Sequence, residues 1–147
     1  MGIKSASTTQ KVKSENLRLE DKTRFEKPKQ VMLLSNTQDL GRIIQLSLEV
    51  IASWQVTIVT LSPRSIAIAE TYQPDVLLLD TVLPDLSEMA MLQMIQANFL
   101  LKNIPLILLT ERMQSNDYRL YASLHVVAAI AKPFDMLELV ELIDRCS

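Results

Sequence analysis

From Val31 to the end of the chain, short runs of consecutive apolar residues alternate with longer segments in which apolar residues recur every three or four positions. The short runs indicate strands buried on both faces, and the longer spacing indicates amphipathic helices. Five strands are predicted, at 31–34, 56–61, 76–80, 104–110 and 126–131. The predicted helices are 39–54, 62–72, 87–99, 114–124 and 136–145. This alternation predicts an α/β fold with a parallel sheet, helices on both of its faces and right-handed crossovers.

The helical segments carry signals for where they begin and which face they bury. Ser62 and Pro63 suit the N-cap and the first position of the second helix, and Ser87 suits the N-cap of the third. Apolar residues at helical spacing predict the inner faces of the first and third helices. These residues are Leu40, Ile43, Ile44, Leu48 and Ile51 in the first helix, and Met89, Leu92, Ile95 and Phe99 in the third.

Polar side chains stand where four of the five predicted strands end. Asp80 closes the third strand, Ser35 and Asn36 follow the first, Thr110 ends the fourth and Lys132 follows the fifth. The carboxyl ends of parallel strands meet at one edge of the sheet, where ligands of such folds collect. We therefore expect these side chains to converge. Taken singly, Asp80 could equally be a solubilising strand-end acid, and Lys132 a purely structural partner for it.

The first 29 residues differ from the rest of the chain in charge and in hydrophobicity. They hold eight basic and four acidic side chains, a net charge of +4, whereas residues 30–147 hold seven basic and thirteen acidic ones, a net charge of −6. With few apolar residues to bury, residues 1–29 are predicted to be a disordered basic tail before a single domain at 30–147. The alternative is a basic arm that contacts nucleic acid or an acidic partner.

Scarce residue types exclude several kinds of site. The chain has two glycines, one histidine and one cysteine, which disfavours glycine-rich phosphate loops, zinc sites and histidine-based nucleophile triads. The single Cys146 can form no internal disulfide. The sequence contains no apolar run long enough to cross a bilayer and no signal-peptide core, so we expect a cytoplasmic protein without membrane contacts.

The residues at the strand ends form a recognisable set. Asp80 is followed four residues later by Pro84, Thr110 ends the fourth strand, and Lys132-Pro133-Phe134 follows the fifth. This arrangement, over about residues 30–147, resembles the receiver domain of two-component response regulators. The resemblance implies a flavodoxin-like (βα)5 doubly wound parallel sheet with the strand order 2-1-3-4-5, and a role in phosphorelay signal transduction.

The resemblance also implies roles for individual residues. Asp80 would accept a phosphoryl group from a histidine kinase, Thr110 would hydrogen-bond the phosphoryl oxygens, and Lys132 would neutralise their charge. The Lys132-Pro133 peptide bond would be cis, which the proline makes energetically accessible. Transfer to a carboxylate depends mainly on positioning and on stabilising negative charge, which suits a lysine and a divalent cation at this edge.

Magnesium binding is where the sequence departs from the family. Receivers usually carry two acids after the first strand to hold Mg²⁺, and Ser35 and Asn36 stand there in this chain. Asn36, Asp80 and Val82 are the remaining candidate ligands. Each lost carboxylate removes on the order of a few kcal/mol of attraction at 4 Å and an effective dielectric of about 20, before desolvation is subtracted. We therefore expect Mg²⁺ binding to be weak or absent.

Further departures point the same way. Ala129 stands where receivers usually have an aromatic residue that reports on the state of the threonine, Glu88 replaces a usual loop glycine, and His125-Val126 replaces a usual Gly-Ala pair. We therefore predict an atypical or pseudo-receiver in which Asp80 and Lys132 form a constitutive ion pair. A functional phosphoacceptor that tolerates poor magnesium binding is the alternative.

The partners we expect are signalling proteins, either a histidine kinase or a downstream effector, contacted by a stand-alone module without an enzymatic activity of its own. Tyr118 and Tyr121 lie three residues apart on a polar helix and are candidates for a docking surface, although packing of one ring explains them equally well. A flavodoxin-like enzyme or small-ligand domain is the alternative from another functional class. The scarcity of glycine and histidine disfavours it.

Overall fold

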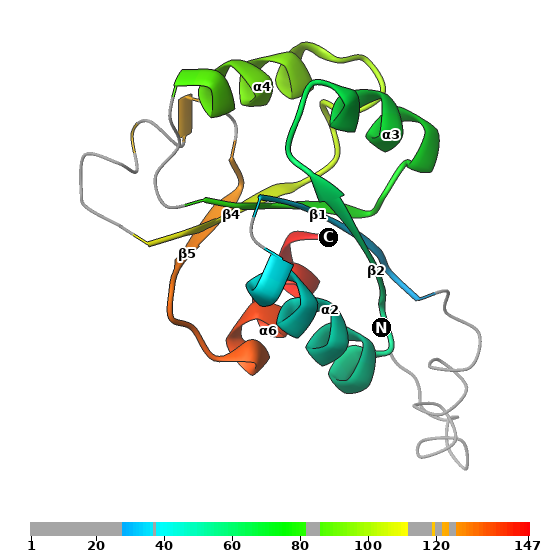
Figure 1. The fold of residues 1–147 in the computed structure, drawn as a ribbon, viewed down its shortest axis with the longest axis vertical. Coiled ribbons are helices and arrows are strands. Elements are labelled where there is room, and N and C mark those ends of the chain that lie inside the picture. The colour runs from blue at the N-terminus through cyan, green and yellow to red at the C-terminus, as the bar shows by residue number, and fades with distance from the viewer. Residues whose placement is uncertain (1–27, 37, 82–85, 112–118, 120–121, 124–125) are drawn as a thin grey trace, which may run out of the picture.

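The computed structural model describes residues 28–36, 38–81, 86–111, 119, 122–123 and 126–147 (Figure 1). The strands of the sheet are β1 (Gln30–Ser35), β2 (Gln55–Thr60), β3 (Val76–Asp80), β4 (Leu106–Thr110) and β5 (Ala128–Ala131). The helices with defined bounds are α2 (Gln38–Ala52), α3 (Arg64–Tyr72), α4 (Leu86–Ala97) and α6 (Met136–Cys146). All four helices and all five strands lie where the hydrophobic pattern predicts them, with ends shifted by a few residues.

All neighbouring strands pair in parallel, in the order β2-β1-β3-β4-β5. Figure 1 shows α3 and α4 on one face of the sheet and α2 and α6 on the other. This is the predicted α/β fold with the 2-1-3-4-5 order that the family resemblance implies, so both predictions are confirmed. Because all strands run the same way, their carboxyl ends share one edge of the sheet.

The core consists of two layers, one on each face of the sheet. Alternate residues of a strand point to opposite faces, so β1 sends Met32 and Leu34 toward α3 and α4, and Val31 and Leu33 toward α2 and α6. Every residue of β3 and of β4 is buried. Because both faces of these strands are buried, their sequences are nearly continuous apolar runs. The well-packed strands hold the polar residues at their carboxyl ends in defined positions.

The start of α3 differs from the prediction. Pro63 already has helical backbone angles and is the N-cap residue, and no side-chain hydrogen bond caps this helix. Ser62 is therefore outside the helix rather than its N-cap. Its carbonyl oxygen accepts hydrogen bonds from the backbone N–H of Ser65 at 2.9 Å and from the Ser65 hydroxyl at 2.6 Å. These bonds satisfy the first turn in place of a capping side chain.

The inner face of α4 also ends earlier than predicted. The side-chain oxygen of Asn98 accepts hydrogen bonds from the backbone N–H groups of Leu100 and Leu101, at 2.8 and 3.2 Å. This local bonding competes with helix continuation, so the chain turns and buries Leu101. Phe99 is left 82% exposed, and the prediction that it lines the core is wrong. The Lys102 ammonium instead lies 5.1 Å from the centre of its ring.

Several predictions fall on residues outside the described ranges. These include the disordered tail up to residue 27, the docking candidates Tyr118 and Tyr121, and Val82, Pro84 and His125. Of the predicted helix at 114–124, the structure describes Arg119, Ala122 and Ser123, which are helical. A search of the described residues finds no helix whose length and apolar character would let it span a membrane.

Candidate functional site

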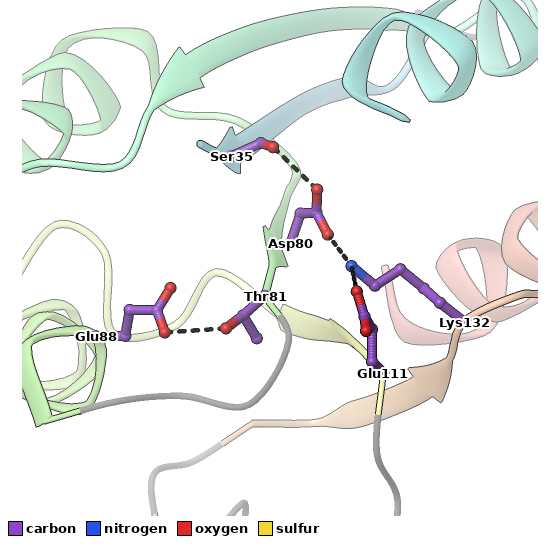
Figure 2. Close-up of polar contacts among 6 residues, drawn as sticks. All are labelled: Ser35, Asp80, Thr81, Glu88, Glu111 and Lys132. Carbon is purple, nitrogen blue, oxygen red and sulfur yellow. Dashed lines mark hydrogen bonds and ion pairs between the residues drawn. The ribbon is translucent and has the colours of Figure 1, made fainter. Parts of the chain in front are cut away.

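Three of the predicted side chains meet at the carboxyl edge of the sheet. The Lys132 ammonium lies 2.5 Å from Oδ1 of Asp80, and the Ser35 hydroxyl donates a hydrogen bond to Oδ2 of the same carboxylate at 2.9 Å. Figure 2 shows Asp80 between the two partners, which come from opposite sides of β3. Both carboxylate oxygens of Asp80 therefore accept a hydrogen bond from the protein itself.

The strand order explains why these residue types reach Asp80. β1 is adjacent to β3, and Ser35 is one position beyond the Leu34–Leu79 pair of that ladder, so a short hydroxyl bridges one strand spacing of about 4.8 Å. β5 is two strands away, which is about 9.6 Å. Lys132 crosses this gap because its flexible four-carbon stem is long enough to place its ammonium over β4.

The Asp80–Lys132 pair is largely removed from solvent. The Asp80 side chain is 1% exposed and the Lys132 side chain 15% exposed. A buried ion pair recovers its desolvation cost only when its geometry is good and its remaining hydrogen-bonding groups are satisfied. The short distance and the second hydrogen bond from Ser35 meet both conditions at Asp80. Removing Lys132 would leave the buried charge of Asp80 without its cation.

A second carboxylate lies close to the lysine. The Glu111 carboxylate is 4.0 Å from the Lys132 ammonium, and its side chain is exposed (Figure 2). At this distance and exposure the Glu111 contact is worth far less than the contact to Asp80, because water screens it. Lys132 is thus held mainly by the buried acid, with a weaker acid at the solvent side of the site.

Backbone contacts fix the positions of Lys132 and Thr110. The backbone N–H of Lys132 donates to the carbonyl oxygen of Thr110 at 2.8 Å, which continues the β4–β5 ladder by one residue. The Lys132-Pro133 peptide bond is cis, as the family resemblance implies. Thr110 is fully buried and follows Leu109, the register partner of Asp80. The structure thus places Thr110 at the same edge, one residue beyond the level of Asp80.

Thr81 and Glu88 form a second polar pair, to one side of the Asp80 group in Figure 2. The buried Thr81 hydroxyl donates a hydrogen bond to Oε1 of Glu88 at 2.9 Å. Glu88 lies in the first turn of α4, where its negative charge suits the helix dipole, and not in the loop to which the sequence comparison assigned it. The reason is that α4 begins at Leu86, so Ser87 is already helical rather than a cap.

The candidate magnesium ligands at the end of β1 carry no charge. Asn36 follows Ser35 directly and is exposed. Within the described ranges, no group of three or more Asp, Glu, His or Cys side chains is placed to hold a metal ion. Asp80 contributes a carboxylate, Ser35 a hydroxyl and Asn36 an amide. Magnesium prefers near-octahedral oxygen ligation with one or two carboxylates, and the strand-one residues supply none.

A cavity of about 420 Å³ opens beside Lys132. Its walls combine apolar side chains from the start of α2 and from the segment leading into α6 with the charged groups of the site. The lining residues are Leu40, Glu111, Lys132, Pro133, Phe134 and Met136. The cavity gives solvent or a small ligand a route to the ammonium of Lys132.

Sequence reasoning found the residues of this edge but not all of their contacts. The sequence predicts that Ser35 lies at this edge and replaces a family acid, but its hydrogen bond to Asp80 depends on strand register, which the sequence does not state. The contact of Glu111 with Lys132 was missed. The sequence does indicate this contact, because Glu111 directly follows Thr110 and therefore lies at the same edge of the sheet as Lys132.

Comparison with known proteins agrees with this geometry. The structure is similar to the chemotaxis protein CheY4 of Vibrio cholerae, with 15% sequence identity, a TM-score of 0.74 and coverage of 82% of this chain and 100% of that one. It is also similar to the receiver domain of the sensor histidine kinase PA1611 from Pseudomonas aeruginosa, which has a magnesium ion coordinated in its active-site cleft. For that pair the identity is 23%, the TM-score 0.71 and the coverage 82% and 98%.

A third similar structure is a putative response regulator from Chloroflexus aurantiacus, with 20% identity, a TM-score of 0.73 and coverage of 82% of this chain and 98% of the other. At these identities the structural likenesses establish the fold alone. The family follows from the sequence, because the model of the response regulator receiver domain matches residues 31–144, most of the chain. With the acid, the threonine and the lysine at the expected strand ends, this chain belongs to the response regulator receiver domain family, whose members act in two-component signalling.

Proposed function

We propose that this chain is an atypical receiver, a signalling domain in which magnesium-dependent phosphorylation of Asp80 is weak or absent. One observation carries the proposal: Ser35 stands where receivers usually place an acid, and its hydroxyl donates to Oδ2 of the buried Asp80 at 2.9 Å. Oδ2 of Asp80 therefore accepts a hydrogen bond from the protein. In receivers that carry two acids at the end of the first strand, this part of the site holds Mg²⁺. Lys132 holds the other oxygen, at 2.5 Å.

The charge balance of the site supports weak magnesium binding. The charges of Asp80 and Lys132 cancel, and the nearby Glu111, which is exposed and screened by water, adds little attraction for a divalent ion. Replacing the two usual acids by Ser35 and Asn36 removes on the order of a few kcal/mol of attraction for each, at 4 Å and an effective dielectric of about 20, before desolvation is subtracted. Mg²⁺ would also have to share an oxygen of Asp80 with the Ser35 hydroxyl or the Lys132 ammonium. The residues described here therefore do not fit a magnesium site.

The position of Ala129 supports an output that does not depend on phosphorylation. Ala129 lies in β5, pairs with Leu108 and packs against the core layer under α3 and α4. Receivers usually carry at this position an aromatic side chain that changes rotamer with the state of the threonine. Alanine has no side-chain rotamer to change. We infer that the chain presents one constant surface to its partners.

Incubation with acetyl phosphate in the presence and absence of Mg²⁺, followed by intact mass measurement, tests the proposal. We expect no magnesium-dependent phosphoryl adduct on the natural sequence. The matched variant carries Ser35→Asp and Asn36→Asp, which restores two acids at the end of β1 and should permit such an adduct. An adduct on the natural sequence that requires Mg²⁺ and disappears in Asp80→Asn would instead establish the alternative, a working phosphoacceptor.

Receiver domains interact with histidine kinases and downstream effectors, and we propose that this chain works through such protein contacts. We propose Tyr118 and Tyr121 as residues that contact these partner proteins. The Tyr118→Ala and Tyr121→Ala variants, compared in a binding assay with the cognate kinase or effector, should weaken binding while leaving thermal stability unchanged. Unchanged binding in both variants would remove these residues from the surface.

Small-ligand binding is a second candidate function, and the cavity beside Lys132 is the observation that favours it. The apolar walls formed by Leu40, Phe134 and Met136 and the charged end formed by Glu111 and Lys132 suit a small amphiphilic molecule. A thermal-shift screen of metabolites tests this function. A metabolite that stabilises the natural sequence but not Met136→Glu would support small-ligand binding. If no metabolite stabilises the chain, signalling remains as the proposed function.

A further inference from the structure

The outward face of α2 is apolar at three positions. Ile43, Leu46 and Val50 are 53%, 52% and 81% exposed. Their spacing of three and four residues places them in one stripe along the helix, which we call the α2 stripe. Of the residues predicted for the buried face, Ile44 and Leu48 are buried, whereas Ile43 and Ile51 are exposed, so the prediction is wrong for these two. Single exposed apolar residues are ordinary, whereas a contiguous stripe marks an interaction surface.

The stripe lies on the opposite side of α2 from the face that contacts the sheet. Gly41 belongs to that buried face, since a Cβ atom there would lie 3.6 Å from side-chain atoms of Ile58 and Leu33. A surface helix normally presents polar residues outward and apolar residues inward. α2 presents apolar residues in both directions, so the hydrophobic requirement of the sheet does not explain the α2 stripe.

Charged residues flank the stripe in a pattern that indicates its partner. Arg42 and Glu49 are exposed, lie seven residues apart and stand on the same side of the stripe, one residue before Ile43 and Val50 respectively. In the described part of the chain, neither side chain forms an ion pair. The spacing of Ile43, Leu46 and Val50 is that of the a and d positions of a heptad, with Arg42 and Glu49 at the two g positions.

We propose that the α2 stripe is a homodimer interface in which α2 of one copy packs antiparallel against α2 of a second copy. A two-fold axis near Leu46 would bring Leu46 against its counterpart and Ile43 against Val50 of the other copy. The same axis would set Arg42 of each copy opposite Glu49 of the other, giving two complementary pairs. Parallel packing would set Arg42 near the uncharged Ser47 and Glu49 near Trp54, which follows the end of α2, and would provide no such complementarity.

The size of the contact predicts its strength. A helix of 15 residues is about 22 Å long, and two such helices pack about 8–10 Å apart. The buried surface would lie below about 1,200 Å², the range of transient complexes, so we expect a dissociation constant on the order of 10⁻⁴ M. The proposed dimer is independent of the proposed loss of phosphorylation, because it uses neither Asp80 nor its neighbours.

Sedimentation velocity of the full chain, over concentrations that bracket this dissociation constant, tests the proposal. The natural sequence should form a dimer as its concentration rises, and Leu46→Glu should remain a monomer. Met94→Glu is the matched control, because Met94 is 51% exposed on α4, and it should dimerise normally. A natural chain that stays monomeric throughout would overturn the proposal, as would dimerisation that Leu46→Glu leaves intact. Far-UV circular dichroism verifies that both variants fold.

A charge exchange tests the antiparallel arrangement itself. Arg42→Glu alone and Glu49→Arg alone each place like charges opposite one another, and each should weaken dimerisation by about tenfold or more. Mixing the two variants creates heterodimers in which both pairs are complementary again, so association should return to the natural level. A mixture that associates no better than its components would overturn the antiparallel pairing. Capture of a different helical protein by a monomeric chain would identify that protein, rather than a second copy, as the occupant of the α2 stripe.

Discussion

The most informative single change is Lys132→Met, which removes one charge of the buried pair and retains most of the side-chain volume. Asp80, whose side chain is 1% exposed, would keep its negative charge without its cation. Removing one partner of a buried ion pair costs about 3–5 kcal/mol of folding free energy. Here we expect the lower end, about 3 kcal/mol, because the Ser35 hydroxyl still donates to Oδ2 and the adjacent cavity can admit water.

Urea denaturation followed by far-UV circular dichroism measures this loss. With a slope of about 2 kcal/mol per molar urea, a loss of 3 kcal/mol lowers the transition midpoint by about 1.5 M. Asp144→Asn is the control, because it removes an ion pair with Lys29 in which the aspartate is exposed and the atoms are 3.9 Å apart. We expect that variant to lose less than about 0.5 kcal/mol.

A double-mutant cycle then isolates the pair itself. Asp80→Asn combined with Lys132→Met leaves no uncompensated charge, so the double variant should be more stable than Lys132→Met alone. The coupling free energy between the two positions should reach about 2 kcal/mol or more. A coupling below about 0.5 kcal/mol, or a loss in Lys132→Met no larger than in the Asp144→Asn control, would refute the reasoning that the buried pair stabilises the domain.

Three further substitutions test other parts of the structure. Gly41→Ala should stabilise the domain by about 0.5–1 kcal/mol in thermal unfolding, because alanine favours the helix and the nearest atoms lie 3.6 Å from the added methyl group. A loss of stability would show that the methyl group clashes with its neighbours. Asp135→Ala removes the side chain that accepts a hydrogen bond from Leu137 at the start of α6, and should cost about 1 kcal/mol, whereas an exposed Asp144→Ala change should cost little. Ser35→Ala should cost about 1–2 kcal/mol in urea denaturation, since Oδ2 of the buried Asp80 loses the hydrogen bond from the Ser35 hydroxyl. An unchanged midpoint would argue that water replaces the hydroxyl.

The parts of the fold that the sequence predicts best are those dictated by burial on both faces. β3 and β4 consist of buried residues throughout, and their short apolar runs predict buried strands, although the start of β4 lies two residues later than predicted. The convergence of Asp80 and Lys132 is also predictable, because it follows from parallel strands and a family motif. The order of the strands came from the family resemblance, since periodicity alone does not distinguish one parallel order from another.

The failures have local physical causes. Helical periodicity continues through Phe99, but the side chain of Asn98 bonds the following backbone and buries Leu101 in its place. The capping box of Asp135 and Glu138 is absent from the prediction, although an acid followed three residues later by a glutamate is a sequence signal for it. The hydrogen bond between Ser35 and Asp80 depends on the register of two strands and on a side-chain rotamer, neither of which the sequence specifies.

We propose that Ser35 and Asn36 leave this site without the two acids that usually hold Mg²⁺ in receivers, whereas Asp80 and Lys132 are retained. A titration of the full chain with Mg²⁺, followed by the backbone amide shifts of Asp80 and Thr81, tests it most directly. We predict no saturable shift for the natural sequence, and a saturable one for the variant with Ser35→Asp and Asn36→Asp. Saturable shifts at Asp80 in the natural sequence, equal to those of the variant, would contradict the account.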